Sequence, residues 1–339
     1  MAPTARVAAV QAEPVWFDMA ATVDKTIGLI RQAAEQGADL VAFPETWIPG
    51  YPIFLWTHAA PMQMPFIARY HENSMTISGP ELTAVRSAAR KHKIIVSLGL
   101  SERAAGSLYI AQTLIGADGN VLHHRRKLKP THVERTLFGE SDGSGMKVVD
   151  TPVGRVGGLC CWEHLQPLTK YAMYAQNEEI HVAAWPCFGI LKQVPALSEA
   201  GNMAVTRTYA MEGGSFVIAS TQIISPGSVA LFSDHTGTPS PFVQGGGGFA
   251  RVYAPDGSPM TEPLEESTEG LVLADIDRSA IALAKNAADP AGHYARPDVT
   301  RLVFDNRRQH AVITPGEAAD SSVLFPPLDD DERLEAESA

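Results

Sequence analysis

Short apolar runs alternate along this chain with segments whose apolar residues recur every three or four positions. The runs over 7–11 and 40–43 have the length and continuity of buried strands. Between them, Val23, Ile27 and Ile30 lie at helical spacing within 20–36. Strands that alternate with helices in this way are typical of α/β proteins, so the pattern predicts an α/β fold.

The alternation continues toward the middle of the chain. A helix over 81–92 precedes a continuous, β-branched run over 94–100, which is typical of a buried strand. After a loop-rich stretch, the same criteria predict strands and helices over these ranges: strands 155–160, 180–184 and 216–221, and helices 165–176 and 199–211.

Two Asp-Gly pairs interrupt this pattern and predict turns. Asp118-Gly119 lies between apolar runs over 108–115 and 121–124, which indicates a hairpin. Asp256-Gly257 lies between predicted strands over 249–254 and 270–277, and a short helix is predicted to follow over 279–285. Hairpins inside an alternating pattern predict mixed sheets rather than an all-parallel sheet.

The chain shows one change of character, close to its end. No Pro-, Ser- or Gly-rich linker divides the first 310 residues, so a single domain over 1–314 is predicted. From Glu317 onward, eight acidic residues accompany one basic residue, Arg333. We therefore expect 315–339 to be an acidic, mobile tail outside the fold.

Composition and charge exclude several classes of function. Of 339 residues, 45% are hydrophobic and 19% charged, which permits a large core. Subtracting 38 acidic from 27 basic residues gives −11, which argues against binding to nucleic acid or to an anionic membrane surface. Three cysteines, Cys160, Cys161 and Cys187, do not make a disulfide framework. With no signal-peptide or membrane-span pattern, we expect a soluble, cytoplasmic protein.

Three predicted strands end in side chains with different chemistry. The strand over 40–43 leads into Glu45, the strand from 121 leads into Lys127, and the strand over 155–160 leads into Cys161. In open α/β sheets, ligands bind at the carboxyl ends of strands. A thiol that attacks, a carboxylate that moves protons and an ammonium that stabilises negative charge form a plausible single site.

Each of these residues also has an ordinary structural interpretation. A helix predicted directly after Cys161 would lower the pKa of its thiol, but most cysteines are simply buried. Glu45 leads into an aromatic stretch that would raise its pKa, although it could equally serve a helix cap or a surface. Lys127 lies in a basic cluster, which is usually a solvated face.

Other chemistries have weaker support in the sequence. No CxxC or HxxxH spacing occurs, so neither a metal nor another cofactor is predicted. A Cys-His hydrolase that uses His164 or His132 is less favoured, because Cys161 ends a strand and helical spacing to His164 cannot be assumed.

Four motifs resemble the nitrilase branch of the carbon-nitrogen hydrolase superfamily, over about residues 6–303. They are Phe43-Pro44-Glu45-Thr46-Trp47-Ile48-Pro49-Gly50-Tyr51-Pro52, the run from Arg125 to Arg135, Gly158-Leu159-Cys160-Cys161-Trp162-Glu163-His164, and the run from Gly292 to Val299. The resemblance implies a catalytic Glu45-Lys127-Cys161 triad, with Glu134 as a second glutamate.

The resemblance also implies an architecture and an assembly. The fold it implies is a four-layer α-β-β-α sandwich with two mixed sheets. It further implies a homodimer as the building block, extended into a larger spiral or filamentous homo-oligomer.

The reaction implied is hydrolysis of a small-molecule nitrile to a carboxylic acid and ammonia. His164 and the residues after it resemble bacterial arylacetonitrilases, which favours aryl or arylaliphatic substrates; an aliphatic nitrilase, an amidase and a non-catalytic scaffold are the alternatives. The predicted pocket residues, each of which could instead be packing, are Tyr51, Trp162, Trp185, His132, Trp47 and Phe188.

Overall fold

The computed structural model describes residues 4–190, 192–233, 238 and 240–309. Its N-terminal part alternates strands with helices, as the pattern predicted. The strands are β1 (Thr4–Ala12), β2 (Leu40–Ala42), β3 (Ile95–Ala104), β4 (Ser107–Ile115) and β5 (Val121–Arg126). The helices are α1 (Met19–Glu35), α2 (Phe54–Thr57), α3 (Met64–Glu72) and α4 (Pro80–His92).

The second part repeats this alternation and then adds two strands and a helix. The strands are β6 (Val149–Thr151), β7 (Gly154–Cys160), β8 (Ile180–Ala184), β9 (Phe216–Gln222), β10 (Arg251–Tyr253) and β11 (Gly270–Asp277). The helices are α5 (Pro167–Tyr174), α6 (Glu199–Gly213) and α7 (Ser279–Ala287).

The strands form one hydrogen-bonded path with the order β5-β4-β3-β2-β1-β9-β8-β7-β6, to which β11 adds beside β1 and β10 beside β9. Parallel and antiparallel pairs both occur, so the sheet is mixed. The path narrows at the β1–β9 contact, where only Gln11 and Ala12 pair with Thr221 and Gln222. This contact divides the strands into an N-terminal half-sheet (β1–β5 and β11) and a C-terminal half-sheet (β6–β10).

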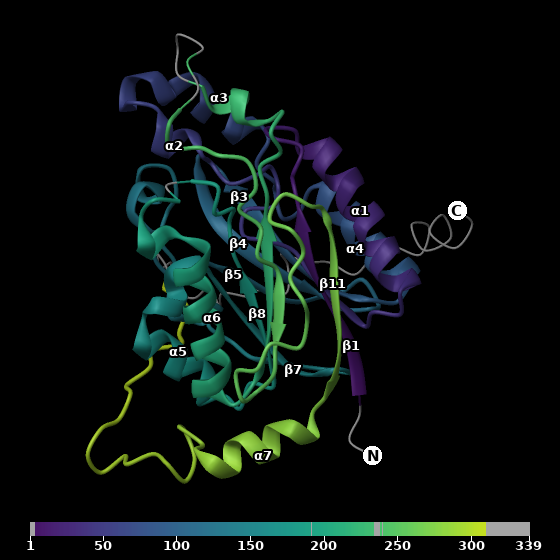
Figure 1. Ribbon diagram of the computed structural model, residues 1–339, viewed down its shortest axis with the longest axis vertical. Coiled ribbons are helices and arrows are strands. Elements are labelled where there is room, and N and C mark those ends of the chain that lie inside the picture. The colour runs from purple at the N-terminus through teal and green to yellow at the C-terminus, as the bar shows by residue number, and fades with distance from the viewer. Residues whose placement is uncertain (1–3, 191, 234–237, 239, 310–339) are drawn as a thin grey trace, which may run out of the picture.

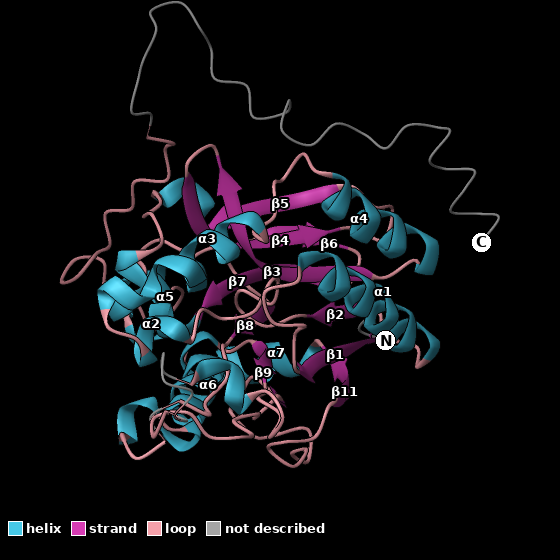
Figure 2. Ribbon diagram, turned by 90° about the horizontal axis from the view of Figure 1, so that it is seen from above, coloured by secondary structure: helices cyan, strands magenta, loops and turns pink. Residues whose placement is uncertain are grey.

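Alternating side chains of the strands supply separate apolar clusters to the two faces of each half-sheet. Val7 and Leu40 of the N-terminal half-sheet share a cluster with Ile180 and Ile218 of the C-terminal half-sheet. On the opposite faces, α1 and α4 cover the N-terminal half-sheet and α5 and α6 cover the C-terminal one. Figures 1 and 2 show these helices on the two outer sides of the strands.

Two sequence predictions differ from the structure. Asp256-Gly257 forms a tight turn in which Ala254 N–H bonds Ser258, but β10 and β11 do not pair with each other, because β10 joins β9 and β11 joins β1. The helix predicted to begin at 165 is also delayed. A 3₁₀ turn over Cys161–Leu165 comes first, and α5 begins at Pro167.

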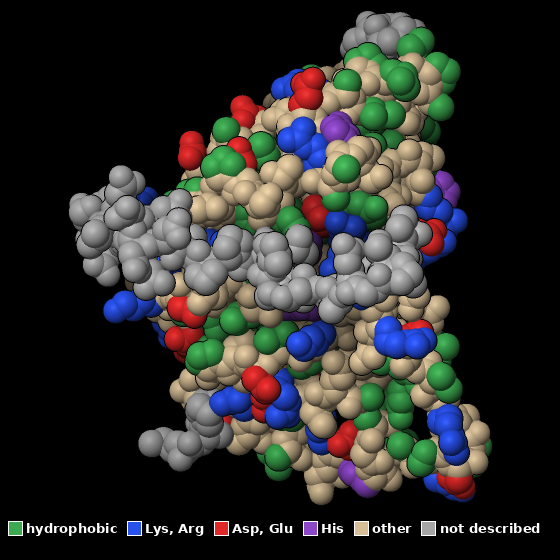
Figure 3. Space-filling model, turned by 180° about the vertical axis from the view of Figure 1, so that it is seen from behind, with side chains coloured by type: hydrophobic (Ala, Val, Ile, Leu, Met, Phe, Trp, Pro, Cys, Tyr) green, Lys and Arg blue, Asp and Glu red, His purple; other side chains and the backbone are tan. Residues whose placement is uncertain are grey.

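The surface is mixed in charge. Figure 3 shows acidic and basic side chains interspersed over one face of the molecule. None of the described helices combines the length and the apolar character needed to cross a membrane. The predicted acidic tail over 315–339 lies outside the described residues.

Candidate active site

Glu45, Lys127 and Cys161 come from three strand ends and lie close together. Glu45 follows β2, Lys127 directly follows β5, and Cys161 directly follows β7. The Cys161 sulfur and one carboxylate oxygen each from Glu45 and Glu134 lie within 4.8 Å of one another. All of these side chains are buried, so the groups interact in a medium of low polarity.

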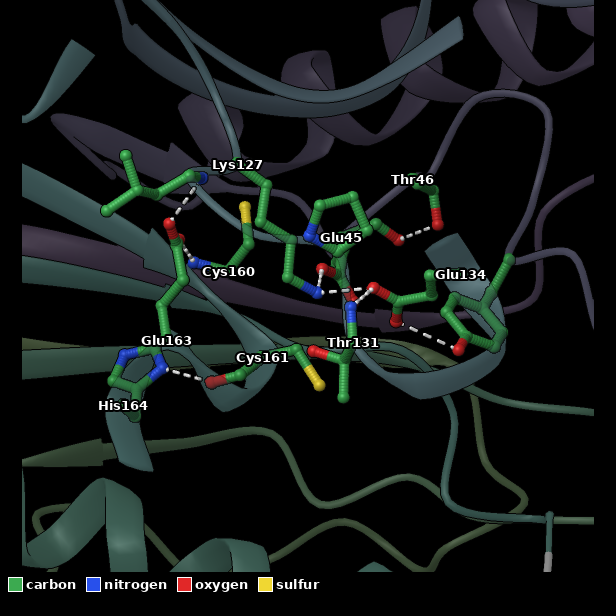
Figure 4. Close-up of polar contacts among 12 residues, drawn as sticks. Glu45, Thr46, Lys127, Thr131, Glu134, Cys160, Cys161, Glu163 and His164 are labelled. Carbon is green, nitrogen blue, oxygen red and sulfur yellow. Dashed lines mark hydrogen bonds and ion pairs between the residues drawn. The ribbon is translucent and has the colours of Figure 1, made fainter. Parts of the chain in front are cut away.

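Lys127 connects the two carboxylates. Its Nζ donates hydrogen bonds of 2.8 Å to Oε1 of Glu45 and 2.8 Å to Oε2 of Glu134 (Figure 4). Glu134 lies in a 3₁₀ turn over His132–Thr136, and its Oε2 also accepts a 2.7 Å bond from Thr131 N–H. Tyr51 donates a 3.0 Å bond from its hydroxyl to Oε1 of Glu134. Both oxygens of Glu134 are therefore fixed.

Glu45 differs from Glu134 because one of its oxygens is unpartnered. Within the described part of the chain, Glu45 Oε2 has no hydrogen-bond partner. Burial raises the pKa of Glu45 to about 8, because the loss of solvation outweighs the charge of Lys127. Burial opposes the charge of Lys127, but Glu134 and Glu45 raise its pKa well above the ordinary value. Lys127 stays positive, and Glu45 titrates near neutrality.

The Cys161 thiol does not have the low pKa that the sequence suggested. Burial and the charge of Glu45 raise its pKa well above the ordinary value, although Lys127 and the N–H of Trp162 oppose this. The predicted helix dipole is weak here because the turn after Cys161 is a short 3₁₀ segment. The resting sulfur is therefore a protonated thiol that needs a base.

The backbone around Glu45 is held by the C-terminal half-sheet. Glu45 N–H donates to the carbonyl of Trp185 at 3.2 Å, and Gln222 donates its side-chain N–H to the carbonyl of Glu45 at 2.5 Å. On the other side, a Cβ at Gly99 would lie 1.8 Å from the carbonyl oxygen of Pro44, so only glycine fits there. The backbone of Glu45 is thus hydrogen-bonded to the C-terminal half-sheet, and the backbone before it packs closely against β3.

A cavity opens onto the thiol, with about 420 Å³ of space that includes its opening to solvent. Its walls are largely aromatic and aliphatic, and its lining is Tyr51, Trp56, Thr131, Glu134, Cys161, Trp162, Pro186, Cys187, Phe188, Ile190 and Leu197. A mostly apolar cavity with a few converging polar groups is typical of a small-molecule site.

Three of the six predicted pocket residues line this cavity, namely Tyr51, Trp162 and Phe188. The other three lie elsewhere. Trp47 is fully buried and donates from its indole to Thr26, and Trp185 is fully buried against His164. His132 is exposed and stacks on Trp56, with ring centroids 5.1 Å apart, so it contacts the cavity wall from outside.

The alternative Cys-His pair is not formed. His164 bonds the backbone carbonyl of Cys161 rather than its sulfur. Among the described residues, the cluster of Glu45, Glu134 and Cys161 has a geometry that could hold a metal ion, but Lys127 already supplies a positive charge to both carboxylates.

A family model described as carbon-nitrogen hydrolase matches residues 6–286 of this chain. The chain belongs to the carbon-nitrogen hydrolase family. It is 54% identical over 301 residues to a nitrilase of Pseudomonas syringae, covering 88% of this chain and 89% of that protein. These matches place it in the nitrilase branch of the family.

Other nitrilases of this family carry different substrate names. The chain is 50% identical over 313 residues to an aliphatic nitrilase of Rhodococcus rhodochrous, covering 92% of this chain and 85% of that protein. It is 46% identical over 310 residues to an arylacetonitrilase of Aspergillus kawachii, covering 89% of this chain and 92% of that protein.

The fold also matches solved members of the family. A carbon-nitrogen hydrolase from Helicobacter pylori superposes with a TM-score of 0.69 at 19% identity, covering 87% of this chain and 96% of that one. At this identity the likeness concerns the α/β fold with its mixed sheet and flanking helices.

In this carbon-nitrogen hydrolase, one buried ion pair near the site was not anticipated from the sequence. Arg125 makes a bidentate pair with Glu163, at 2.9 and 2.7 Å. The same carboxylate accepts 2.8 Å bonds from Cys160 N–H and from Leu128 N–H. Glu163 therefore connects the backbone of Cys160, which precedes Cys161, with the backbone of Leu128, which follows Lys127. Its position two residues after Cys161 was the only available signal.

Proposed function

We propose that this protein hydrolyses organic nitriles to carboxylic acids and ammonia, with Cys161 as the nucleophile. One observation carries the proposal: a buried thiol lies within 4.8 Å of two carboxylates, one of which has an unpartnered oxygen. The nitrilase relatives support the choice of a nitrile as substrate.

In the proposed reaction, Glu45 takes the proton of the Cys161 thiol as the sulfur bonds to the nitrile carbon. As the sulfur–carbon bond forms, one π bond of the nitrile breaks and its electron pair goes to the nitrogen. The nitrogen takes the proton that Glu45 received, which gives a thioimidate. Lys127 and the N–H of Trp162 stabilise the developing negative charge. Water activated by Glu45 then adds to the carbon and ammonia leaves, which gives a thioester. A second water releases the carboxylic acid and restores the thiol.

Glu134 has a different role in this proposal from Glu45. Both of its oxygens are already bonded, to Lys127 and Thr131 on one side and to Tyr51 on the other. It is suited to orient Lys127 and to keep that ammonium charged, rather than to accept the thiol proton.

We further propose a preference for aryl or arylaliphatic nitriles. The aromatic side chains of Trp56, Trp162 and Phe188 on the cavity wall support it, because flat aromatic groups pack well against such surfaces. An aliphatic nitrilase with the same triad is the second candidate, favoured by the 50% identity to the Rhodococcus rhodochrous enzyme.

Ammonia release from phenylacetonitrile, an aliphatic dinitrile and the matching amides tests both proposals. We expect phenylacetonitrile to be hydrolysed fastest and the amides slowest. Faster release from the amides would identify an amidase instead, and faster release from the dinitrile would reverse the aryl preference. The absence of turnover on all of them would favour a non-catalytic scaffold.

The larger organisation is also a proposal. The two half-sheets that share an apolar cluster, each with helices outside, are consistent with a four-layer α-β-β-α sandwich built from one domain over 1–314. We propose that the chain forms homodimers that extend into a spiral or filamentous homo-oligomer in the cytoplasm. Light scattering of the purified protein measures the assembly, and a monodisperse monomer would contradict it.

A further inference from the structure

A chain of four buried side chains extends from the backbone carbonyl of Cys161. His164 Nδ1 lies 2.6 Å from that carbonyl oxygen, and its Nε2 lies 2.9 Å from Nε2 of His181. His181 Nδ1 lies 2.8 Å from Oε1 of Glu178, whose Oε2 accepts a 2.6 Å bond from the Tyr209 hydroxyl. We call these four residues the His164 chain.

The donors and acceptors of the His164 chain allow few positions for its protons. The carbonyl of Cys161 can only accept, so His164 Nδ1 carries a hydrogen. Burial lowers the pKa of His164 well below its ordinary value, and the adjacent His181 lowers it further. The ring is therefore neutral, its Nε2 carries no hydrogen, and it must accept from Nε2–H of His181.

The next pair, His181 and Glu178, holds one proton between its two facing atoms. Burial and the neighbouring Glu178 raise the pKa of Tyr209 well above its ordinary value, so this hydroxyl stays protonated and donates. The short contact between His181 Nδ1 and Glu178 needs one further hydrogen, on either the ring or the carboxyl group. In both forms the pair is neutral overall, and His181 keeps the Nε2–H that faces His164.

Ring stacking fixes the same two histidines. His181 stacks on Tyr209 with centroids 3.7 Å apart and an interplanar angle of 25°, and His164 stacks on Trp185 at 5.0 Å and 23°. His164, His181, Glu178 and Tyr209 are all at most 1% exposed. The two histidine rings have little freedom to rotate, so the His164 chain ends in a rigid donor that points to the carbonyl of Cys161.

That carbonyl belongs to a residue in an unfavourable backbone conformation. Cys161 has a φ of +47°, which is costly for a side chain with a Cβ and persists only where the surroundings impose it. Figure 4 shows the carbonyl oxygen pointing to His164 and the sulfur pointing the opposite way, on the side of Glu134. A bond that fixes the oxygen therefore fixes the backbone from which the Cys161 side chain extends.

We infer that His164 is a positioning residue for the nucleophile. It holds the carbonyl of Cys161 on the buried side, which keeps the thiol within reach of Glu45. His181 and Glu178, through their shared proton, keep the ring of His164 in the orientation that donates to this carbonyl. The inference rests on the proposed function, since it assigns a role within that reaction.

Turnover of the wild type and of four variants, one of them a control, tests the inference on a nitrile that the wild type hydrolyses. His164→Phe and His181→Phe keep the stacked rings and remove the nitrogens. We expect each to lower kcat by about a hundredfold, as a displacement of about 1 Å can do, with KM changed less than about threefold. Alkylation of Cys161 by iodoacetamide should slow in parallel, because it reports the thiol without a nitrile.

Glu178→Gln is the conservative variant. Its amide N–H can donate to His181 Nδ1 while its oxygen accepts from Tyr209, so it reproduces the pair with the proton on Glu178. We expect kcat within about threefold of wild type. His123→Phe is a matched control, since it removes a half-buried ring that bonds the backbone carbonyl of Gly145 at 2.9 Å. It should leave kcat unchanged.

Histidine-selective ¹⁵N NMR of the wild type adds a measurement that does not depend on whether variants fold. We expect a neutral His164 with its hydrogen on Nδ1; a hydrogen on Nε2 would overturn the assignment. Normal kcat in His164→Phe, or a loss in Glu178→Gln as large as in His181→Phe, would also overturn it. An inactive wild type would instead contradict the proposed nitrile hydrolysis, while the NMR result would still stand.

Discussion

Lys127 fixes one oxygen of Glu45 and leaves the other without a partner among the described residues. The ammonium donates a 2.8 Å bond to Oε1, whereas Oε2 has no hydrogen-bond partner. A buried carboxylate normally satisfies both oxygens, so the unpartnered one is where a proton can be taken up. Lys127 therefore orients the carboxylate of Glu45 and keeps its own positive charge, while Glu45 can gain and lose a proton.

The pKa of Glu45 predicts the pH dependence of turnover. Burial raises this pKa to about 8, and only the ionised form can take the thiol proton. We expect kcat/KM to fall about tenfold for each pH unit below about 8 and to level off above it. Initial rates of ammonia release measured from about pH 6 to 9 check this; a flat profile would contradict the role of Glu45.

Cys161→Ala should abolish turnover with little effect on folding. Removing the nucleophile leaves no atom to carry the acyl group, so we expect a loss of at least about a thousandfold. Circular dichroism establishes whether the variant folds. Cys187→Ala, which removes another thiol on the cavity wall, should retain activity; the reverse result would place the nucleophile at Cys187.

Lys127→Met should destabilise the protein as well as inactivate it. The change leaves Glu45 and Glu134 buried without their positive partner, which costs about 3–5 kcal/mol. We expect the loss to grow as pH rises, since ionised carboxylates suffer most from the missing charge. Urea unfolding measures it. Lys129→Met, which breaks only the exposed pair with Glu140, should cost less than about 1 kcal/mol.

Glu163→Gln should change the acid stability of the protein. Burial opposes the shift, but Arg125 lowers the pKa of Glu163 in the folded protein. The ion pair between them therefore stabilises the fold at pH values above about 4.3, which is the pKa of a glutamate in the unfolded chain. That contribution is lost as pH falls through the lowered folded pKa. The stability gap between wild type and variant should therefore shrink in acid. Urea unfolding at several pH values checks this; a gap that widens in acid would contradict it.

Trp56→Ala should weaken the binding of aryl substrates more than the binding of aliphatic ones. Trp56 lines the cavity and donates from its indole to Tyr51 at 3.2 Å. Removing the ring takes away apolar wall area, so we expect KM for phenylacetonitrile to rise about tenfold. An aliphatic dinitrile serves as the internal control and should be affected less. Equal effects on both substrates would show that Trp56 does not determine specificity.

The sequence predicted those parts of the site that depend on local pattern. Glu45, Lys127 and Cys161 each follow a recognisable apolar strand, so their meeting at one place follows from how parallel strand ends lie. The resemblance added Glu134, whose 3₁₀ turn has no comparable periodic signal. The helices α1 and α4 were found because their apolar stripes are regular.

The remaining features depend on tertiary contacts that no local pattern records. Trp185 follows a strand as Glu45 does, yet its side chain is fully buried and stacks on His164, while Phe188 lines the cavity. The helices α2 and α3 follow an aromatic stretch without clear periodicity and were not predicted. The high pKa of Cys161 arises from burial and from Glu45, which is 116 positions earlier in the chain.

The narrow β1–β9 contact separates the two half-sheets that carry the catalytic residues. Glu45 and Lys127 extend from one half-sheet and Cys161 from the other, so neither portion alone contains a complete set. During refolding, turnover must therefore return only when the two portions have docked in their final register. Recovery of catalysis therefore reports the docking of the two half-sheets, which a probe of strand formation alone does not detect.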